Sequence, residues 1–265
     1  MRVDIPDTTI FVKRAGVGRP LLLIHGFPLN NEMWRPQIVT LSNNSLVIAP
    51  DLRGHGQSPP TPGPYSMDML ADDCAGVLKE LGINQPAVIC GLSMGGYVSF
   101  AFIRRHPELV AGLILVATRA GADSEEGRNN RDNAAQKVKT EGIQPVIDSM
   151  LPILVSPKTY QERAGLVQQI EGIMAQTSPE GMISALMGMK SRPDSTPSLE
   201  KIAIPTLILH GADDQIIPVS EAEAMHAAIK GSYLEIIPGA GHLLNLEQPQ
   251  LFNHAVEKFL SELGD

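Results

Sequence analysis

Residues 87–96 read Ala-Val-Ile-Cys-Gly-Leu-Ser-Met-Gly-Gly, an apolar run followed by a Gly-x-Ser-x-Gly motif. The run 87–90 has no polar alternation, which is typical of a strand covered on both faces in a parallel sheet. Residues 96–106 have helical spacing, so the motif lies in a sharp turn between a strand and a helix. Its glycines leave room for the strained backbone that lifts a side chain above the sheet, at a helix N-terminus where negative charge is favoured. The pattern therefore predicts a nucleophilic serine at Ser93.

Short apolar runs recur on both sides of this motif, each bounded by Gly, Pro or Asp. They lie at 20–24, 46–49, 113–117, 206–209 and 234–237. Segments with the 3.6-residue period of an amphipathic helix separate them, most clearly at 67–81 and 251–263. Alternation at 10–14 predicts an edge strand. Strands that alternate with helices predict an α/β fold, in which a mostly parallel, twisted sheet is flanked by helices.

The segment from residue 121 to residue 200 interrupts this alternation, because it has helical spacing but no strand-like run. A segment of this length inside a compact domain normally has structure of its own. We therefore expect a helical cap at 121–200, inserted between two strands of a core formed by residues 1–120 and 201–265. Its adaptable Met and Leu side chains, among them Met150 and Leu154, are candidates to line a substrate pocket. Ordinary packing of apolar helix faces is the alternative for each of them.

The composition limits the partners and the location of the protein. The 265 residues carry a net charge of −8, which argues against binding to nucleic acid or to an anionic membrane. Cys74 and Cys90 stand in apolar contexts without metal-ligand spacing, so we expect buried thiols in a reducing compartment. No apolar run approaches the roughly 18–20 residues of a membrane span, and Asp4 stands where a signal peptide would be apolar. These features predict a cytoplasmic protein that is a monomer or a small homo-oligomer.

A serine hydroxyl needs a general base, and the base needs an acid to orient it. His242 is the candidate base, because it follows the apolar run 234–237 on a glycine-rich turn. Asp213 and Asp214 follow the preceding apolar run, and either carboxylate could orient the base. The order Ser93, aspartate, His242 is the nucleophile–acid–base order of this motif class. All three groups are expected beyond the carboxyl ends of strands, where open α/β sheets place their sites.

Acyl transfer also requires hydrogen-bond donors for the oxyanion that forms at the attacked carbonyl. The backbone N–H of Met94, directly after the serine, is one candidate. The N–H of Phe27 is the other, because Pro28 has no N–H. His25 is expected to shape this loop, and it is a candidate substrate contact together with Trp34, for which packing of the first helix is the alternative. Such a site requires no metal and no organic cofactor.

The chain resembles the α/β-hydrolase family over essentially its whole length. The resemblance rests on Leu-Ile-His-Gly-Phe-Pro at 23–28, Ala-Pro-Asp-Leu-Arg-Gly-His-Gly-Gln-Ser at 49–58, Gly-Leu-Ser-Met-Gly-Gly at 91–96, Gly-Ala-Asp-Asp at 211–214 and Gly-His at 241–242. The chain is most similar to the small serine members, which include carboxylesterases, enol-lactone hydrolases such as 3-oxoadipate enol-lactonase, and cofactor-free haloperoxidases and perhydrolases. In the family's G-x-x-D pattern the acid matches Asp214, with Asp213 as the fallback. The resemblance also implies that Asp51, Arg53 and Ser58 shape a loop rather than act in catalysis.

The resemblance implies a serine hydrolase that cleaves carboxylic esters or lactones through an acyl-enzyme, and the apolar cap favours small apolar acyl groups. Haloalkane dehalogenases and epoxide hydrolases resemble the chain at residues 25–28 but have an aspartate nucleophile in place of Ser93, so their chemistry is not expected. Hydrolases of carbon–carbon bonds rank third, since their early loop is typically richer in Ser and Gly. Two further alternatives stay open: perhydrolysis by the same triad, and a small-molecule receptor with slow or no turnover.

Overall fold

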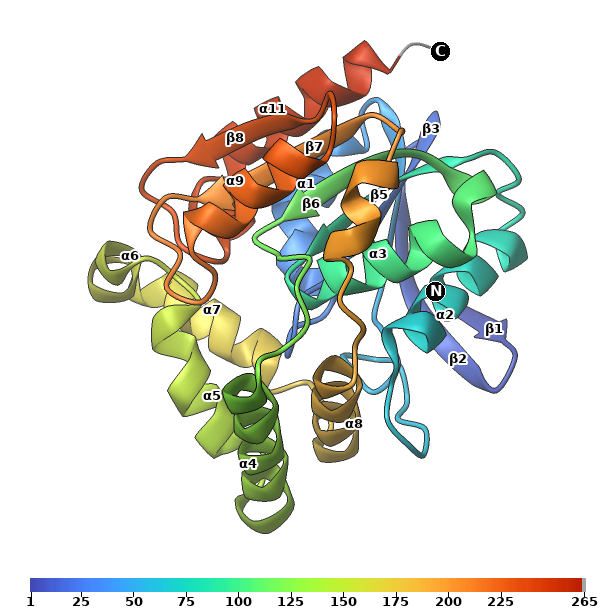
Figure 1. The fold of residues 1–265 in the computed structure, drawn as a ribbon. Helices are drawn as coiled ribbons and strands as arrows, with labels where there is room; N and C mark the ends of the chain where they lie inside the picture. Colours follow the sequence, from blue (N-terminus) through green and yellow to red (C-terminus); the bar gives the residue numbers. More distant parts are fainter. Residues whose placement is uncertain (264–265) are drawn as a thin grey trace.

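A single sheet dominates the structure, a computed structural model that describes residues 1–263. Within those residues its strand order is β1-β2-β4-β3-β5-β6-β7-β8 (Figure 1). The strands are β1 (Arg2–Ile5), β2 (Thr8–Ala15), β3 (Arg19–Ile24), β4 (Ser45–Pro50), β5 (Ala87–Leu92), β6 (Val110–Val116), β7 (Thr206–Gly211) and β8 (Tyr233–Ile237). The six strands β4, β3, β5, β6, β7 and β8, in this order across the sheet, all pair in parallel. The predicted α/β fold with a mostly parallel sheet is therefore confirmed.

The predicted edge strand at 10–14 is a strand but does not lie at the edge. It belongs to β2, which pairs antiparallel with β4 on one side and with β1 on the other. Strand β1 was not predicted; it has four residues, in which the charged Arg2 and Asp4 alternate with the buried Val3 and Ile5. So short an alternation gives little periodic signal, and only its pairing with β2 makes it a strand.

Alternate residues of each central strand enter two different cores, one on each face of the sheet. In β3, Leu22 and Ile24 belong to one core, whereas Leu21 and Leu23 belong to the other. This alternation follows from the two-residue period of a strand, and it explains the unbroken apolar runs in the sequence. The first face is covered by α2 (Met67–Glu80), α3 (Met94–Arg105) and α9 (Val219–Ala228). The second is covered by α1 (Arg35–Leu41), α10 (Leu244–Glu247) and α11 (Pro249–Glu262).

Five further helices lie between β6 and β7, in the segment 121–200 for which the sequence predicts a helical cap; we call residues 121–200 the insertion. They are α4 (Glu125–Glu141), α5 (Gln144–Met150), α6 (Pro157–Glu162), α7 (Ala164–Met174) and α8 (Pro179–Lys190). Four 3-10 turns complete the described elements: η1 (Asn31–Trp34), η2 (Pro107–Leu109), η3 (Leu151–Ile153) and η4 (Thr196–Lys201). Figure 1 shows the helices of the insertion gathered on one side of the sheet, beyond the ends of its strands.

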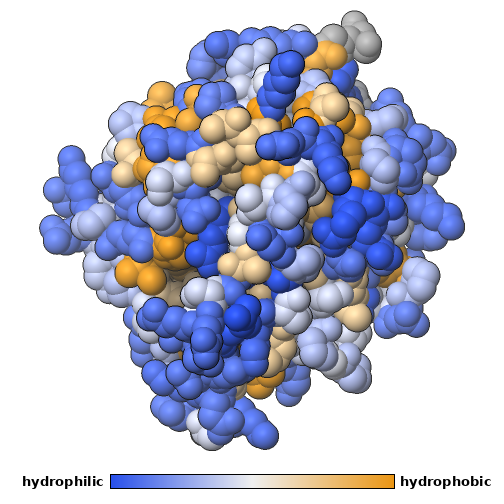
Figure 2. All heavy atoms as spheres, viewed as in Figure 1, coloured by the Kyte–Doolittle hydropathy of each residue, from blue (hydrophilic) through white to orange (hydrophobic). Residues whose placement is uncertain are grey.

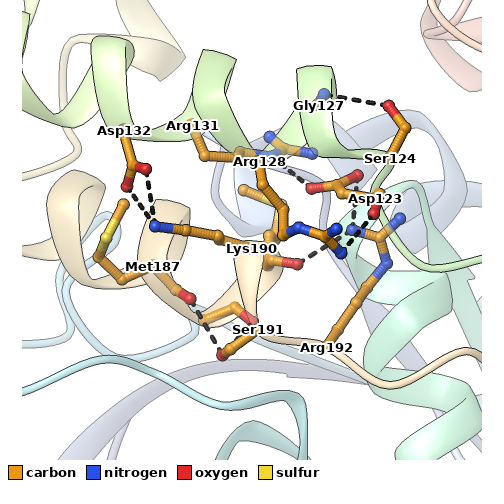
Figure 3. Close-up of polar contacts among 12 residues, drawn as sticks. Asp123, Ser124, Gly127, Arg128, Arg131, Asp132, Met187, Lys190, Ser191 and Arg192 are labelled. Carbon is orange, nitrogen blue, oxygen red and sulfur yellow. Dashed lines mark hydrogen bonds and ion pairs between the residues drawn. The ribbon is translucent and has the colours of Figure 1, made fainter.

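One buried carboxylate joins the beginning of the insertion to its end (Figure 3). Asp123 lies just before α4, and its carboxylate accepts contacts from Arg119 at 2.8 Å, Arg131 at 3.1 Å and Arg192 at 2.8 Å. The Arg192 side chain is only 3% exposed, and its guanidinium lies 4.0 Å from the centre of the Tyr97 ring. Burial alone would raise the pKa of Asp123, but Arg131 and Arg192 hold it below its ordinary value.

The surface shown in Figure 2 is largely hydrophilic, with hydrophobic side chains in separate patches. None of the helices in residues 1–263 combines the length and the apolar character of a membrane span. Cys74 and Cys90 are both free and buried, and burial raises the pKa of each thiol, so neither is poised to react.

Candidate active site

Ser93 stands alone between β5 and α3, in a backbone conformation that residues other than glycine rarely adopt. Its φ is +55° and its ψ is −112°. Two hydrogen bonds to the end of β6 and the loop after it hold this conformation: the N–H of Ser93 donates to the carbonyl of Val116 at 2.9 Å, and Thr118 Oγ1 donates to the carbonyl of Ser93 at 2.9 Å. A strained residue that its surroundings fix in this way is typical of a functional site.

The two glycines of the motif are required by close approach of the backbone. A Cβ on Gly91 would lie 2.1 Å from the carbonyl oxygen of Gly95, and a Cβ on Gly95 would lie 2.2 Å from that of Ile24. Any larger residue would therefore push α3 away from the sheet. The structure thus gives the motif the strand–turn–helix context that its sequence predicts.

The loop after β3 lies against Ser93. A Cβ on Gly26 would be 3.4 Å from Cβ of Ser93, so the peptide that leads into Phe27 passes beside the serine side chain. His25 ties this loop to the loop after β4, because its Nε2 accepts a hydrogen bond from the N–H of Leu52 at 2.9 Å. Its Nδ1 therefore carries the proton and donates to the carbonyl of Gly26 at 3.0 Å.

Two backbone N–H groups near Ser93 have no hydrogen-bond partner among residues 1–263. They belong to Phe27, in the loop after β3, and to Met94, the first residue of α3. Unpaired N–H groups in a buried region are uncommon, and both residues are buried. These two N–H groups are the predicted donors to an oxyanion.

Asp214 lies in the loop after β7 with its side chain fully buried. Its Oδ1 accepts hydrogen bonds from the N–H groups of Ile216 at 2.8 Å and Ile217 at 3.0 Å. Its Oδ2 faces Nδ1 of His242 at 2.8 Å. Burial opposes the charged form, but the contact with His242 and the backbone donors hold the pKa of Asp214 below its ordinary value. Its neighbour Asp213 is exposed.

His242 lies on the loop between β8 and α10 and is 2% exposed. Because Nδ1 donates to Asp214, the opposite ring nitrogen, Nε2, carries the free lone pair. The end of β7 and this loop are in close contact, since a Cβ on Gly211 would lie 2.1 Å from the carbonyl oxygen of Gly241. Within residues 1–263, no three His, Cys, Asp or Glu side chains are grouped so that they could hold a metal ion.

The insertion is hydrogen-bonded to the loops that carry these groups. Thr177 Oγ1 donates to the carbonyl of Pro28 at 2.8 Å, and Asn30 Nδ2 donates to the carbonyl of Ile173 at 3.3 Å. On the acid side, Gln215 Nε2 donates to the carbonyl of Val155 at 2.9 Å. The loop after β3, which precedes Ser93 in sequence, and the loop after β7, which follows it, are therefore both hydrogen-bonded to the insertion.

The four residues expected to touch a substrate lie in different surroundings. Trp34 is fully buried and packs on Phe252 with ring centroids 6.0 Å apart, the core position that was the alternative for this residue. His25 is fully buried, and both of its ring nitrogens are bonded to the backbone. Leu154 is buried beside the loop of His242, whereas Met150 is half-buried and packs against both cores.

Three polar residues near the candidate site were not assigned to it from the sequence. Gln215 and Glu247 bond to backbone groups of the insertion or of the His242 loop. His210 places its Nε2 3.5 Å from Oδ2 of Asp214, and the same nitrogen is hydrogen-bonded to the carbonyl of Ile217 at 2.9 Å. For Glu247 the sequence does hold one signal: an acidic residue directly after the mostly apolar run Leu-Leu-Asn-Leu suggests a buried carboxylate.

The sequence matches known proteins over most of the chain, and the structure matches one over all of it. A family model described as alpha/beta hydrolase fold matches residues 19–249. The chain is 33% identical to 3-oxoadipate enol-lactonase 2 of Acinetobacter baylyi over 93% of this chain and 90% of that protein. It is 32% identical to a non-heme haloperoxidase of Rhodococcus erythropolis over 89% of each. A thermophilic esterase from Thermogutta terrifontis, solved with malate bound, superposes with a TM-score of 0.97 at 39% identity, covering 100% of this chain and 99% of that one.

Proposed function

The chain belongs to the α/β-hydrolase family, and from this premise we propose that it is a serine hydrolase of carboxylic esters or lactones. The observation that carries the proposal is the contact of 2.8 Å between His242 Nδ1 and Asp214 Oδ2, in a molecule that holds Ser93 in a strained turn. Relatives named as an esterase and an enol-lactonase support the same reaction class. The protein acts on small molecules and requires no metal or organic cofactor.

In the first half-reaction, Oγ of Ser93 attacks the carbonyl carbon while Nε2 of His242 takes the hydroxyl proton. Asp214 stays ionised, keeps the imidazole in the tautomer that exposes Nε2, and stabilises the imidazolium. The N–H groups of Phe27 and Met94 donate to the oxyanion of the tetrahedral intermediate. The intermediate collapses as His242 gives its proton to the leaving alkoxide, which leaves an acyl group on Ser93.

In the second half-reaction, His242 removes a proton from water as the water oxygen attacks the acyl carbon. The second tetrahedral intermediate uses the same two donors. Its collapse returns the proton to Ser93 and releases the carboxylic acid. For a lactone, the leaving alkoxide stays attached to the acyl group, and the product is a single hydroxy acid.

The apolar side chains of the insertion favour a small apolar acyl group. Leu154 is buried beside the His242 loop, and Met150 packs between the two cores with part of its surface free. Both are offered as residues that line the acyl site, because unbranched and branched aliphatic side chains adapt to such a group. The structure supports a backbone-shaping role for His25 and a core role for Trp34.

The test is the rate of hydrolysis of p-nitrophenyl esters from acetyl to dodecanoyl by the wild type and by Ser93→Ala. We expect turnover by the wild type with an optimum at short chains, and loss of several powers of ten in the variant. Equal rates for the two proteins would exclude Ser93 as the nucleophile. A folded wild type that is inactive on esters and lactones would favour the carbon–carbon hydrolase or receptor alternatives.

A second candidate is perhydrolysis, favoured by the likeness to a non-heme haloperoxidase. Here hydrogen peroxide replaces water in the second half-reaction: its oxygen attacks the acyl carbon, its proton passes to His242, and the product is a peracid. Peracid can be measured by bromide oxidation at millimolar peroxide in acetate buffer. Formation that disappears in Ser93→Ala would establish this activity beside hydrolysis, and its absence in the wild type would exclude it.

A further inference from the structure

The last residue of α10, Glu247, is a buried carboxylate whose two oxygens bind two separate parts of the chain. Its side chain accepts a hydrogen bond at Oε1 from the N–H of Gly241 at 2.7 Å. At Oε2 it accepts one from the N–H of Ser156, in the insertion, at 2.9 Å. The residue is 3% exposed. Glu247 therefore bridges the loop of His242 and the insertion.

These contacts surround His242 in sequence. Gly241 directly precedes it, and Leu243, directly after it, donates its N–H to the carbonyl of Leu154 at 2.9 Å. The two backbones are packed as closely as they can be, because a Cβ on Gly241 would lie 2.5 Å from the nitrogen of Ser156. His242 is thus held from both sides by one short stretch of the insertion.

The charge of Glu247 has an unusual environment. Among residues 1–263 no lysine, arginine or histidine forms an ion pair with its carboxylate; Arg163 reaches only its main-chain carbonyl, at 2.8 Å. A buried carboxylate without a cationic partner is costly unless backbone donors satisfy it. Glu247 makes two short, charge-assisted hydrogen bonds, to the N–H groups of Gly241 and Ser156. These bonds hold the two backbone segments together more firmly than a neutral side chain would.

We propose that Glu247 is a positioning residue for His242. It fixes the backbone at Gly241 against the insertion, and so sets the direction in which the imidazole meets Asp214 and Ser93. This inference rests on the proposed function, in which His242 is the general base. It assigns to the insertion a second task besides lining the substrate site: the base is aligned only when residues 154–156 are in place.

The test is Glu247→Gln, which keeps the size of the side chain but gives it one acceptor and one donor for two N–H groups. Glu257→Gln is the matched control, because it removes the same charge from an exposed residue in α11. Both are compared with the wild type by kcat for p-nitrophenyl acetate across pH, per active site titrated with a fluorophosphonate. We read the alkaline plateau, where the base is fully deprotonated.

We expect the plateau of Glu247→Gln to fall at least tenfold per titrated site with little change in KM, since misplacing a catalytic group by about 1 Å can cost on the order of 10²-fold. Glu257→Gln is expected to match the wild type. A role in stability alone would lower the number of titrated sites but not the plateau, and loss of charge alone would move the pH limb. A plateau within twofold of the wild type would overturn the proposal.

Two further measurements keep the outcome decisive. If Glu247→Gln does not fold, amide exchange in the wild type decides: Gly241 and Ser156 must both be strongly protected, and exchange at the rate of an open loop would overturn the proposal. Ser93→Ala separates this question from the function itself. An active wild type that loses activity in Ser93→Ala while Glu247→Gln keeps its plateau refutes the positioning role and leaves the proposed function intact.

Discussion

Two neighbouring aspartates after β7 have opposite surroundings. The carboxylate of Asp214 is buried and accepts two backbone N–H bonds besides its contact with His242. Asp213 is exposed, and what holds it is its own N–H, which donates to the carbonyl of Ala240 at 2.9 Å. The two residues are adjacent in sequence, but the turn directs only the carboxylate of Asp214 toward His242.

We expect Asp214→Asn to lower kcat by on the order of 10⁴-fold, because the amide can no longer hold the imidazole in the tautomer with Nε2 free. Asp213→Asn should change kcat by less than about threefold. Steady-state kinetics on p-nitrophenyl acetate at pH 8 measures both. A large loss in Asp213→Asn with little change in Asp214→Asn would reverse the assignment of the acid.

At the scale of single residues, the sequence reveals the site residues whose conformation depends on their neighbours in the chain. Ser93 is visible because its turn demands glycines at fixed positions, and His242 because glycines surround it after a strand. The pattern of residues alone could not separate Asp213 from Asp214, because the two are adjacent and only the backbone geometry of the turn determines which carboxylate faces His242. It also could not show Glu247 or Gln215, because their partners are backbone N–H and carbonyl groups, which every residue offers alike.

Helix α8 and the loop after β4 touch through two glycines. A Cβ on Gly181 would lie 2.0 Å from the carbonyl oxygen of Gly54, and Ser178 at the N-cap of α8 donates its N–H to the same carbonyl at 3.2 Å. The insertion therefore meets the core here by backbone-to-backbone contact, which leaves no room for a side chain.

Gly181→Ala should destabilise the protein by about 1–3 kcal/mol, since the added methyl must push α8 away from the loop. Gly172→Ala is the matched control in α7, where a Cβ would meet nothing within 4 Å. That change should instead stabilise by roughly 0.5–1 kcal/mol through helix propensity. Urea unfolding of both variants measures the difference. Equal effects would show that the contact at Gly54 relaxes without cost.

The junction at Asp123 gives a second comparison between elements. Asp123→Asn leaves the buried Arg192 without its anion and should cost about 3–5 kcal/mol. Asp132→Asn removes the partner of Lys190, whose contact of 2.7 Å lies on the surface, and should cost at most about 1 kcal/mol. The free energy of unfolding in urea measures both. Similar losses for the two variants would contradict a special role for the buried junction.

Elements with a strong period were predictable, and elements defined by their partners were not. The apolar runs became β3 to β8 within a few residues. For β3 to β7 the reason is burial on both faces of a parallel sheet, whereas β8 at the edge is partly exposed and its run contains Glu235. The short strand β1 was missed, and β2 was placed at the edge, because pairing between strands is not encoded in the period of either one. The division of residues 121–200 into five helices likewise depends on capping residues and prolines, and the spacing of apolar residues alone does not predict where each helix begins and ends.

Two buried histidines near the site make the stability of the whole molecule depend on pH. His25 and His55 are fully buried with ring centroids 5.1 Å apart. Burial, together with the neighbouring His55, lowers the pKa of His25 to about 3. Burial likewise lowers the pKa of His55 to about 4. Both rings are therefore neutral in the folded protein at any pH at which the enzyme would work.

The free energy of unfolding should fall as the pH drops from about 6.5 toward 4, because the unfolded chain takes up protons that the folded protein excludes. For His55 alone the full effect is roughly 3 kcal/mol. At pH 5, His55→Gln should lower the number of protons taken up on unfolding by about one, measured from the slope of stability against pH. His254→Gln, at an exposed position, supplies the comparison. An unchanged slope in His55→Gln would contradict the burial argument.

The segments that lead into and out of the insertion lie side by side: the N–H of Ser195 donates to the carbonyl of Ala120 at 3.0 Å, and Arg192 bonds to the carbonyl of Gly121 at 2.9 Å. The sheet therefore presents a fixed pair of adjoining ends, whatever the chain does between them. A different segment can therefore replace the insertion as a cassette while Ser93, Asp214 and His242, which all lie outside it, keep their places. If Glu247 positions His242 as we propose, the exchange has one condition: the incoming cassette must again offer a backbone N–H where Ser156 meets Glu247.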